Sequence, residues 1–208
     1  MKFSKKFLIV AAALMGMSAS PIMITDASAG VKVKAKTIYY KVRGRNGKSL
    51  NDSMLKESRK AITISHAIAA TRYNFDYSEP KIVVKNGRCV VDKVDITLNV
   101  EYIYPKWVNS GSASREMRNH WMAFYKELKR HELQHGKIAQ EGAKALEKEI
   151  KTMKGHTRLG CKDMGAFAGY KLNRVIRNTR SQQKLFDRRE YSRFSKISKL
   201  QKNLYHAE

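Results

Sequence analysis

The sequence predicts an α+β protein in which a small antiparallel β-sheet in the N-terminal half packs on a long helix and the C-terminal part is helical. Three observations predict this fold class. Residues 94–104 alternate between apolar and polar side chains, which is typical of a strand with one buried face. Asn86-Gly87 separates two apolar runs, which is the signal of a tight β-hairpin. From residue 117 to residue 150, apolar side chains recur at intervals of three and four, which is typical of an amphipathic helix.

The first 29 residues have the three parts of a secretory signal peptide. Three lysines precede an uncharged, largely apolar run over residues 7–17, and Ala27-Ser28-Ala29 offers small side chains before a cleavage site. We expect cleavage between Ala29 and Gly30 and export to the periplasm or the outside of the cell. A membrane anchor is the weaker interpretation, because the apolar run is short for a bilayer span, and we expect no transmembrane segment after cleavage.

The remaining chain predicts a single domain over residues 30–192 and a basic tail over residues 193–208, which we expect to be exposed or partly disordered. The whole chain of 208 residues has a net charge of +24. An exported protein this basic is expected to meet anionic envelope polymers rather than nucleic acid. The alternative is that the charge only keeps the protein soluble.

The elements before the long helix follow from local patterns. Residues 31–42 alternate apolar and basic side chains before a β-prone run, which predicts an edge or half-exposed strand. A short helix is expected over residues 49–61, and Pro105 is expected to end the strand at 94–104 because proline lacks a backbone donor. Cys89 and Cys161 are the two cysteines of the chain, and in an oxidising compartment they predict one disulfide.

The long helix is expected to begin after Ser114, an N-cap residue, with Glu116 in the first turn. Its apolar stripe passes through residues 117–150 and is followed by the breaker "MKGHTRLGC". Gly136 and Gly142 leave open whether the stripe belongs to one long helix or to two shorter ones. The segment from residue 162 onward is helical in pattern and heavily basic.

The stripe carries a match to H-E-x-x-H at His131, Glu132 and His135. Residues four apart share a helix face, so both imidazoles can offer a nitrogen to one Zn²⁺ at about 2.0–2.1 Å. Glu132 then lies at the edge of that face, where it can take a proton from a zinc-activated water and act as the general base. The motif therefore predicts a zinc hydrolase site.

The alternative is a pair of histidines that are hydrogen-bonded inside a helical core. His131 and His135 lie on the apolar stripe between Leu128 and Ile138, so both are expected to face the interior. Burying unpaired polar groups is costly, and a metal ion would satisfy both rings at once. The position of the pair therefore favours metal binding.

Several features together resemble one family: "YPKW" after the strand, Trp121, the H-E-x-x-H motif and the two cysteines. They are similar to the bacterial domain of unknown function 922 family, and the resemblance covers residues 39–191. Its members are generally described as predicted secreted zinc-dependent proteases. The resemblance implies a zincin-like fold with an active-site helix, and in such a layout the strand at 94–104 would lie along the cleft and bind substrate backbone by strand addition.

A catalytic zinc usually has three protein ligands and an open position for water, so a third ligand is needed. Asp187 is the first candidate, because "KLFDRREYS" resembles the family's Tyr-Asp element near the C-terminal end. In the family pattern a threonine and then a His-Gly pair follow this element, and here Glu190 and Ser192 stand in the threonine and histidine places.

His156 and Glu141 are the next candidates. On an unbroken helix Glu141 lies about 240° past His135, off the zinc-facing side, because each residue turns the helix by about 100°. It could serve only if the chain turned near Gly136.

The sequence thus predicts a secreted or periplasmic zinc metallopeptidase that acts on peptide or protein substrates. His131, His135 and Asp187 would hold Zn²⁺, and Glu132 would be the general base. The competing hypothesis is a non-catalytic basic cell-envelope protein on the same fold, which binds anionic surface polymers. The absent histidine at Ser192 favours this second hypothesis, and the intact motif argues against it.

Overall fold

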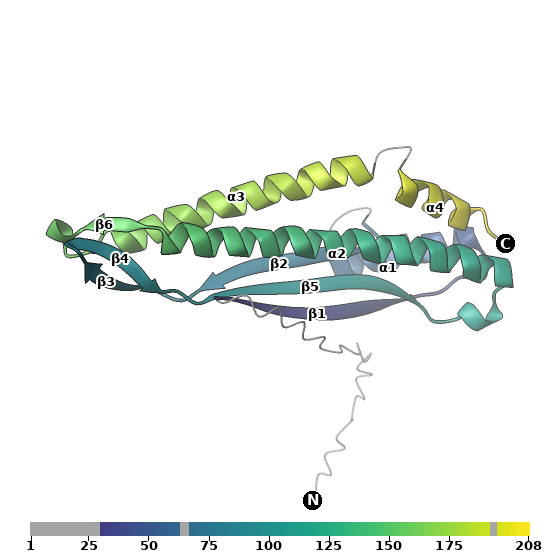
Figure 1. Cartoon of the computed structure of the whole chain (residues 1–208). Helices are drawn as coiled ribbons and strands as arrows, with labels where there is room; N and C mark the ends of the chain where they lie inside the picture. Colours follow the sequence, from purple (N-terminus) through teal and green to yellow (C-terminus); the bar gives the residue numbers. More distant parts are fainter. Residues whose placement is uncertain (1–29, 63–66, 192–194) are drawn as a thin grey trace, which may run out of the picture.

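The computed structural model describes residues 30–62, 67–191 and 195–208, and Figure 1 shows the arrangement of their helices and strands. The predicted signal peptide lies outside the described residues. Within them the fold is α+β, as predicted, with two three-stranded sheets and four α-helices. None of these helices is both long and apolar enough to span a bilayer.

The long sheet contains β1 (Val31–Val42), β5 (Ile96–Trp107) and β2 (Ala70–Tyr77), in the order β1-β5-β2. β2 runs antiparallel to β5, but β1 runs parallel to it, so the prediction of a purely antiparallel sheet is wrong. Alternation along a strand carries no information on the direction of its neighbour. Parallel neighbours need a long connection, which here contains a helix and three further strands.

β5 continues to Trp107 instead of ending before Pro105. Its pairing with β2 stops at Ile103, so beyond that residue β5 has β1 on one side and no strand on the other within the described residues. An edge position of this kind tolerates a proline, because no second neighbour needs the missing donor.

The small sheet contains β3 (Lys81–Lys85), β4 (Arg88–Lys93) and β6 (Lys154–His156), and both of its pairings are antiparallel. Asn86 and Gly87 connect β3 to β4 with φ angles of 50° and 69°, which is the conformation that a two-residue hairpin turn requires. The predicted hairpin is confirmed. The predicted disulfide is also present, and it joins Cys89 in β4 to Cys161.

The four helices are α1 (Gly47–Ile62), α2 (Arg115–Lys151), α3 (Met164–Glu190) and α4 (Lys196–Tyr205); short 3-10 turns occupy Ser110–Ser112 and Thr157–Leu159. Figure 1 shows α2 running the length of the molecule, with the long sheet on one side and α3 on the other. The Ser114 hydroxyl accepts a hydrogen bond from the Met117 backbone at 3.0 Å, so the predicted N-cap is confirmed.

Neither glycine interrupts α2, which is a single helix of 37 residues. Both glycines instead allow close packing. A methyl group at Gly136 would lie 2.0 Å from the Tyr102 hydroxyl of β5, and one at Gly142 would lie 2.4 Å from the Thr179 hydroxyl of α3. The sequence left open whether this segment forms one helix or two. The structure shows one helix, and its two glycines lie where it packs against β5 and α3.

Two hydrophobic cores lie along α2. The first joins α1, α4 and the N-terminal half of α2, where Phe124 and Leu128 are buried. The second joins the small sheet, α3 and the C-terminal half of α2, where Ala143 and Ile150 are fully buried. His131 lies between these two sets of apolar side chains, so the predicted site is located where the two cores meet.

The prediction that the C-terminal tail is exposed or partly disordered is wrong for residues 196–205. Residues 196–205 form α4, and Ile197 and Leu204 are buried in the first core. Lys196 pairs with the buried carboxylate of Glu127 on α2 at 3.1 Å. The prediction missed an amphipathic helix because its apolar residues are few among many basic ones. These few residues nevertheless fall on one face of the helix.

Candidate metal centre

α2 carries the two histidines and the glutamate of the motif on its inward side. His131 and Glu132 are 1% and 2% exposed, and His135 is partly buried one turn further along. The two imidazole rings lie with their centres 4.7 Å apart, as expected for residues four apart on a helix.

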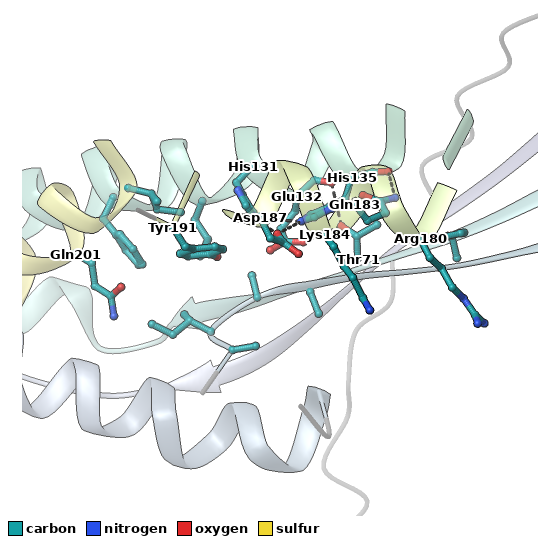
Figure 2. A pocket seen from close by; sticks show the side chains of 18 residues that line it. Thr71, His131, Glu132, His135, Arg180, Gln183, Lys184, Asp187, Tyr191 and Gln201 are labelled. Carbon is teal, nitrogen blue, oxygen red and sulfur yellow. Dashed lines mark hydrogen bonds and ion pairs between the residues drawn. The ribbon is translucent and has the colours of Figure 1, made fainter. Parts of the chain in front are cut away.

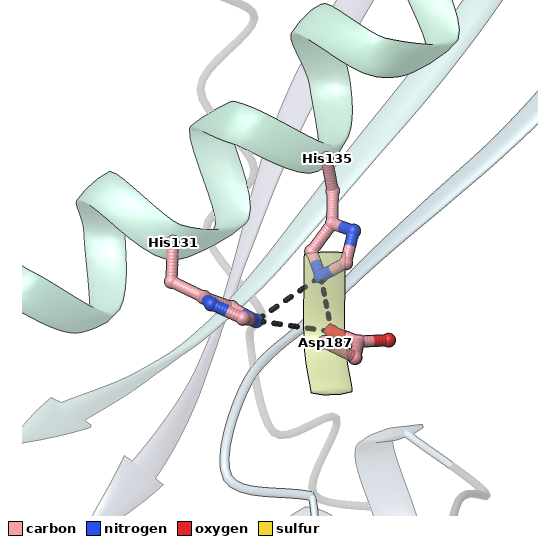
Figure 3. A group of neighbouring side chains, drawn as sticks. All are labelled: His131, His135 and Asp187. Atoms are coloured by element: carbon pink, nitrogen blue, oxygen red, sulfur yellow. Dashed lines mark hydrogen bonds and ion pairs between the residues drawn. The ribbon is translucent and has the colours of Figure 1, made fainter. Parts of the chain in front are cut away.

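Asp187, near the end of α3, reaches the same point from the opposite side (Figure 3). Its Oδ1 lies 3.4 Å from Nε2 of His131 and 3.0 Å from Nε2 of His135. The two Nε2 atoms are 3.1 Å apart. Two nitrogens and one carboxylate oxygen therefore form a nearly equilateral triangle, which is a donor set suited to a divalent cation.

Gln183, one turn before Asp187 on α3, fixes the orientation of His135. Its amide nitrogen donates to the His135 carbonyl oxygen at 3.0 Å, so its Oε1 is the atom that faces Nδ1 of the ring, at 2.5 Å. Nδ1 must then donate, and a neutral His135 has a free lone pair on Nε2. This lone pair is directed to the triangle.

His131 is held mainly by aromatic packing. The ring of Phe186 stacks on it with centroids 4.9 Å apart, and Tyr191 meets it edge-on at 4.7 Å. Its buried Nδ1 has no hydrogen-bond partner among the described residues, and the nearest carboxylate oxygen, Oε2 of Glu190, is 3.8 Å away. Ring packing, rather than a hydrogen bond at Nδ1, therefore directs Nε2 of His131 to Asp187.

Glu132 lies beside the triangle and contacts β2. The Thr71 hydroxyl is 2.8 Å from Oε2 of Glu132 and 2.9 Å from the Glu132 carbonyl oxygen. Burial raises the pKa of the Glu132 carboxyl group, although Thr71 and the two histidines oppose this shift. A carboxylate with a raised pKa is a stronger proton acceptor, which suits a general base.

The charge state of Asp187, the second acid of the site, favours cation binding. Partial burial opposes ionisation of Asp187, but hydrogen bonds from His131 and His135 outweigh it and hold the pKa below its usual range. Asp187 is therefore a carboxylate at neutral pH. For His135, burial is likewise outweighed by Asp187 and Gln183, which raise the pKa of its imidazole.

The triangle opens into a cleft of about 620 Å³ between α2, α3, α4 and β2 (Figure 2). β2 is an edge strand, and it contributes Ala70, Thr71 and Tyr73 to the wall. The expectation that the strand at 94–104 lies along the cleft is wrong, because β5 is the central strand and both of its sides are paired beside the site. Among the described residues, its neighbour β2 has the free edge.

The two other candidates for a third ligand lie elsewhere. Glu141 is exposed on α2, because the helix continues unbroken and carries this residue to the solvent side. His156 belongs to β6 in the small sheet, where it is paired with Arg88. Of the three candidates, the structure brings only Asp187 to the histidine pair.

Sequence reasoning missed Gln183 and Thr71. Gln183 had a usable signal, because it lies four residues before Asp187 and so shares its helix face. Thr71 had none, since its position depends on how β2 pairs with β5 and how that sheet packs under α2.

The comparisons with known proteins confirm the family that the sequence resembles. The family model described as bacterial protein of unknown function (DUF922) matches residues 37–193, and the chain belongs to this family. No curated protein and no solved structure gives a significant match.

Proposed function

We propose that this protein is an exported zinc-dependent peptidase that hydrolyses peptide bonds in the periplasm or outside the cell. The observation that carries the proposal is the triangle of Nε2 of His131, Nε2 of His135 and Oδ1 of Asp187, with separations of 3.0 to 3.4 Å. Ligand atoms about 2.0–2.1 Å from a tetrahedral zinc are about 3.3–3.4 Å from one another. The donor set therefore fits zinc in kind, number and spacing.

Hydrogen bonds alone account for the triangle less well. Each of its three edges would need one proton between the two atoms that it joins. Because Gln183 takes the Nδ1 proton of His135, a neutral His135 has no proton at Nε2. His131 can supply one proton at most from Nε2, and a protonated His135 would supply one more, so at least one of the three edges has no hydrogen bond in either state. A cation inside the triangle removes this conflict.

When bound, zinc would polarise a substrate carbonyl and lower the pKa of a water toward about 7. The remaining steps belong to the chain. Glu132 lies beside the ligands, where it can take the proton of the attacking water and pass it to the nitrogen of the leaving amine. The water oxygen then ends on the carbonyl carbon as the C–N bond breaks.

Tyr191 is placed to assist this reaction. It lines the cleft next to His131. Partial burial and the carboxylates of Glu132 and Asp187 raise the pKa of its hydroxyl, so the phenol keeps its proton. A neutral phenol can donate a hydrogen bond to the oxygen that becomes negatively charged in the transition state.

The free edge of β2 supports a peptide as the substrate. An extended peptide can pair with an unpaired strand edge through its backbone, and β2 borders the cleft at Thr71 and Tyr73. A helix with H-E-x-x-H above a sheet whose edge strand borders the cleft is the arrangement expected of a zincin-like protein. Export follows from the signal-peptide pattern of residues 1–29.

A second function is favoured by the charge. With a net charge of +24, the protein could bind anionic surface polymers without catalysis. This alternative predicts binding that does not depend on Glu132 or on zinc, so the experiment below separates the two functions.

The test is hydrolysis of a quenched fluorescent peptide library by the purified protein that begins at Gly30. We expect activity that is lost with a chelator and restored by zinc. Glu132→Gln should lower the activity about 10²- to 10⁴-fold, the range typical of general-base catalysis, and leave zinc binding unchanged. Glu141→Gln, at an exposed glutamate of the same helix, is the control and should have no effect. Equal activity of the Glu132→Gln and Glu141→Gln proteins would reject the proposal.

A further inference from the structure

The cleft is chemically different on the two sides of the candidate metal centre. α2 and α3 run in opposite directions along it, as Figure 1 shows. Residues that precede His131 on α2 therefore lie at one end of the cleft, and residues that precede Asp187 on α3 lie at the other. Figure 2 shows this separation, with Tyr191 and Gln201 on one side of the centre and Arg180 on the other.

The α3 end of the cleft is cationic. Arg180 and Lys184 precede Asp187 by seven and three residues, share its helix face, and line the cleft. With a rise of about 1.5 Å per residue, they lie about 10 and 5 Å along the axis from Asp187. An extended peptide advances about 3.3 Å per residue, so these side chains lie within about three peptide residues of the metal centre.

Both cations lack an acidic partner among the described residues. This distinguishes them from two other basic residues of α3, since Lys171 and Arg174 are both paired with Glu149. The positive charges of Arg180 and Lys184 are thus available to a ligand.

The α2 end of the cleft is apolar. Phe124 and Leu128 precede His131 by seven and three residues, and both line the cleft together with Ile68 and Ile197. All four side chains are buried in the first core with 1% to 7% of their surface exposed, so only a few of their atoms face the cleft, and these form a rigid wall. Such a wall favours an apolar side chain over a charged one.

We propose that the cleft selects peptides with an acidic side chain on one side of the scissile bond and an apolar side chain on the other. Arg180 and Lys184 bind the acid, and the wall that contains Phe124 and Leu128 binds the apolar group. This inference rests on the proposed function and names the substrate class of the same site. An anionic polymer without apolar groups would use only half of the cleft, which is why a peptide is the better occupant.

The test measures binding of fluorescein-labelled peptides by anisotropy to the chelator-treated protein, so that it does not depend on zinc or on hydrolysis. The first peptide carries two glutamates and, three residues further on, a leucine. In the second peptide glutamine replaces both glutamates, and in the third serine replaces the leucine. We expect the first to bind at least about tenfold more tightly than either of the others, which corresponds to about 1.4 kcal/mol.

A charge-matched pair of variants separates the cleft from the general basicity of the protein. Arg180→Glu/Lys184→Glu should weaken binding of the first peptide at least about tenfold. Lys144→Glu/Lys148→Glu makes the same change of charge at two exposed lysines of α2 that do not line the cleft, and should weaken binding less than about twofold.

Equal weakening by the two double variants would overturn the proposal, because binding would then depend on net charge alone. Equal binding of the first and third peptides would overturn it as well, because the apolar wall would have no role. Selective binding without any hydrolysis by the zinc-loaded protein would instead reject the proposed peptidase and leave the peptide site in place.

Discussion

The two ends of α3 are attached to the rest of the molecule in different ways. Before its first turn, Cys161 is bonded to Cys89 of the small sheet. Near its last turns, the side chain of Gln183 donates to the His135 backbone carbonyl oxygen, and Asp187 contacts the imidazole of His135. The first attachment is covalent, and the second consists of groups that a metal ion would bring together. From this comparison we expect the disulfide to support the fold and the ligand end of α3 to respond to zinc.

The largest effect is expected at the disulfide end. Replacing both cysteines, Cys89→Ser/Cys161→Ser, opens a loop of 72 residues, and loop-closure entropy predicts a loss of about 4 kcal/mol in the free energy of unfolding. Urea unfolding followed by circular dichroism measures this loss. Zinc affinity at low urea should be unchanged. A loss of zinc binding in the folded variant would show that the two ends are not independent.

The next effect is stabilisation by zinc at the other end. A ligand that binds only the native state stabilises it, by about 2.7 kcal/mol at a free concentration of one hundred times its Kd. We expect zinc to raise the melting temperature of the wild-type protein and to leave that of His131→Ala/His135→Ala unchanged. An equal shift in both proteins would mean that zinc binds somewhere else.

A smaller effect is expected at Gln183, which orients His135 but is not one of the three proposed metal ligands. Gln183→Leu should weaken zinc binding about 10- to 100-fold, the usual cost of losing a hydrogen bond to a histidine ligand. Competition with a chromophoric chelator measures the affinity. Gln182→Leu, at the exposed neighbouring position, is the control, and the account is contradicted if both variants bind zinc equally well.

The smallest effects on stability are expected from alanine substitutions at one glycine of α2 and one glycine of α3. Gly136→Ala should destabilise the protein by about 1 kcal/mol, because the methyl group would press on the Tyr102 ring beside the metal centre. Gly165→Ala, in the first turns of α3 with open space around it, should be neutral or stabilise by up to about 1 kcal/mol. Thermal unfolding distinguishes the two, and stabilisation by both substitutions would contradict the described packing of β5 against α2.

Local patterns predicted most of the elements and the core of the site. Helical spacing was enough to place His131 and His135 on one inward face with Glu132 at its edge, and the Asn-Gly dipeptide was enough to predict the hairpin at residues 86 and 87. These features depend on residues that are neighbours in sequence, so the period of the helix or the turn geometry determines them.

Features that depend on distant segments could not be read in this way. The parallel pairing of β1 with β5 and the docking of α4 are decided by which apolar faces meet, and no local spacing encodes that choice. Asp187 was chosen from a family resemblance and not from spacing. The geometry that brings it within 3.4 Å of both histidines comes from the antiparallel packing of α3 on α2.

The most direct test of the central claim is the zinc content of the purified protein that begins at Gly30, measured by mass spectrometry of the metal after dialysis. The account predicts one zinc per chain in the wild type, none in His135→Ala, and a strongly reduced content in Asp187→Ala. A wild-type protein without zinc after incubation with the metal, or a His135→Ala protein that retains a full equivalent, would contradict it.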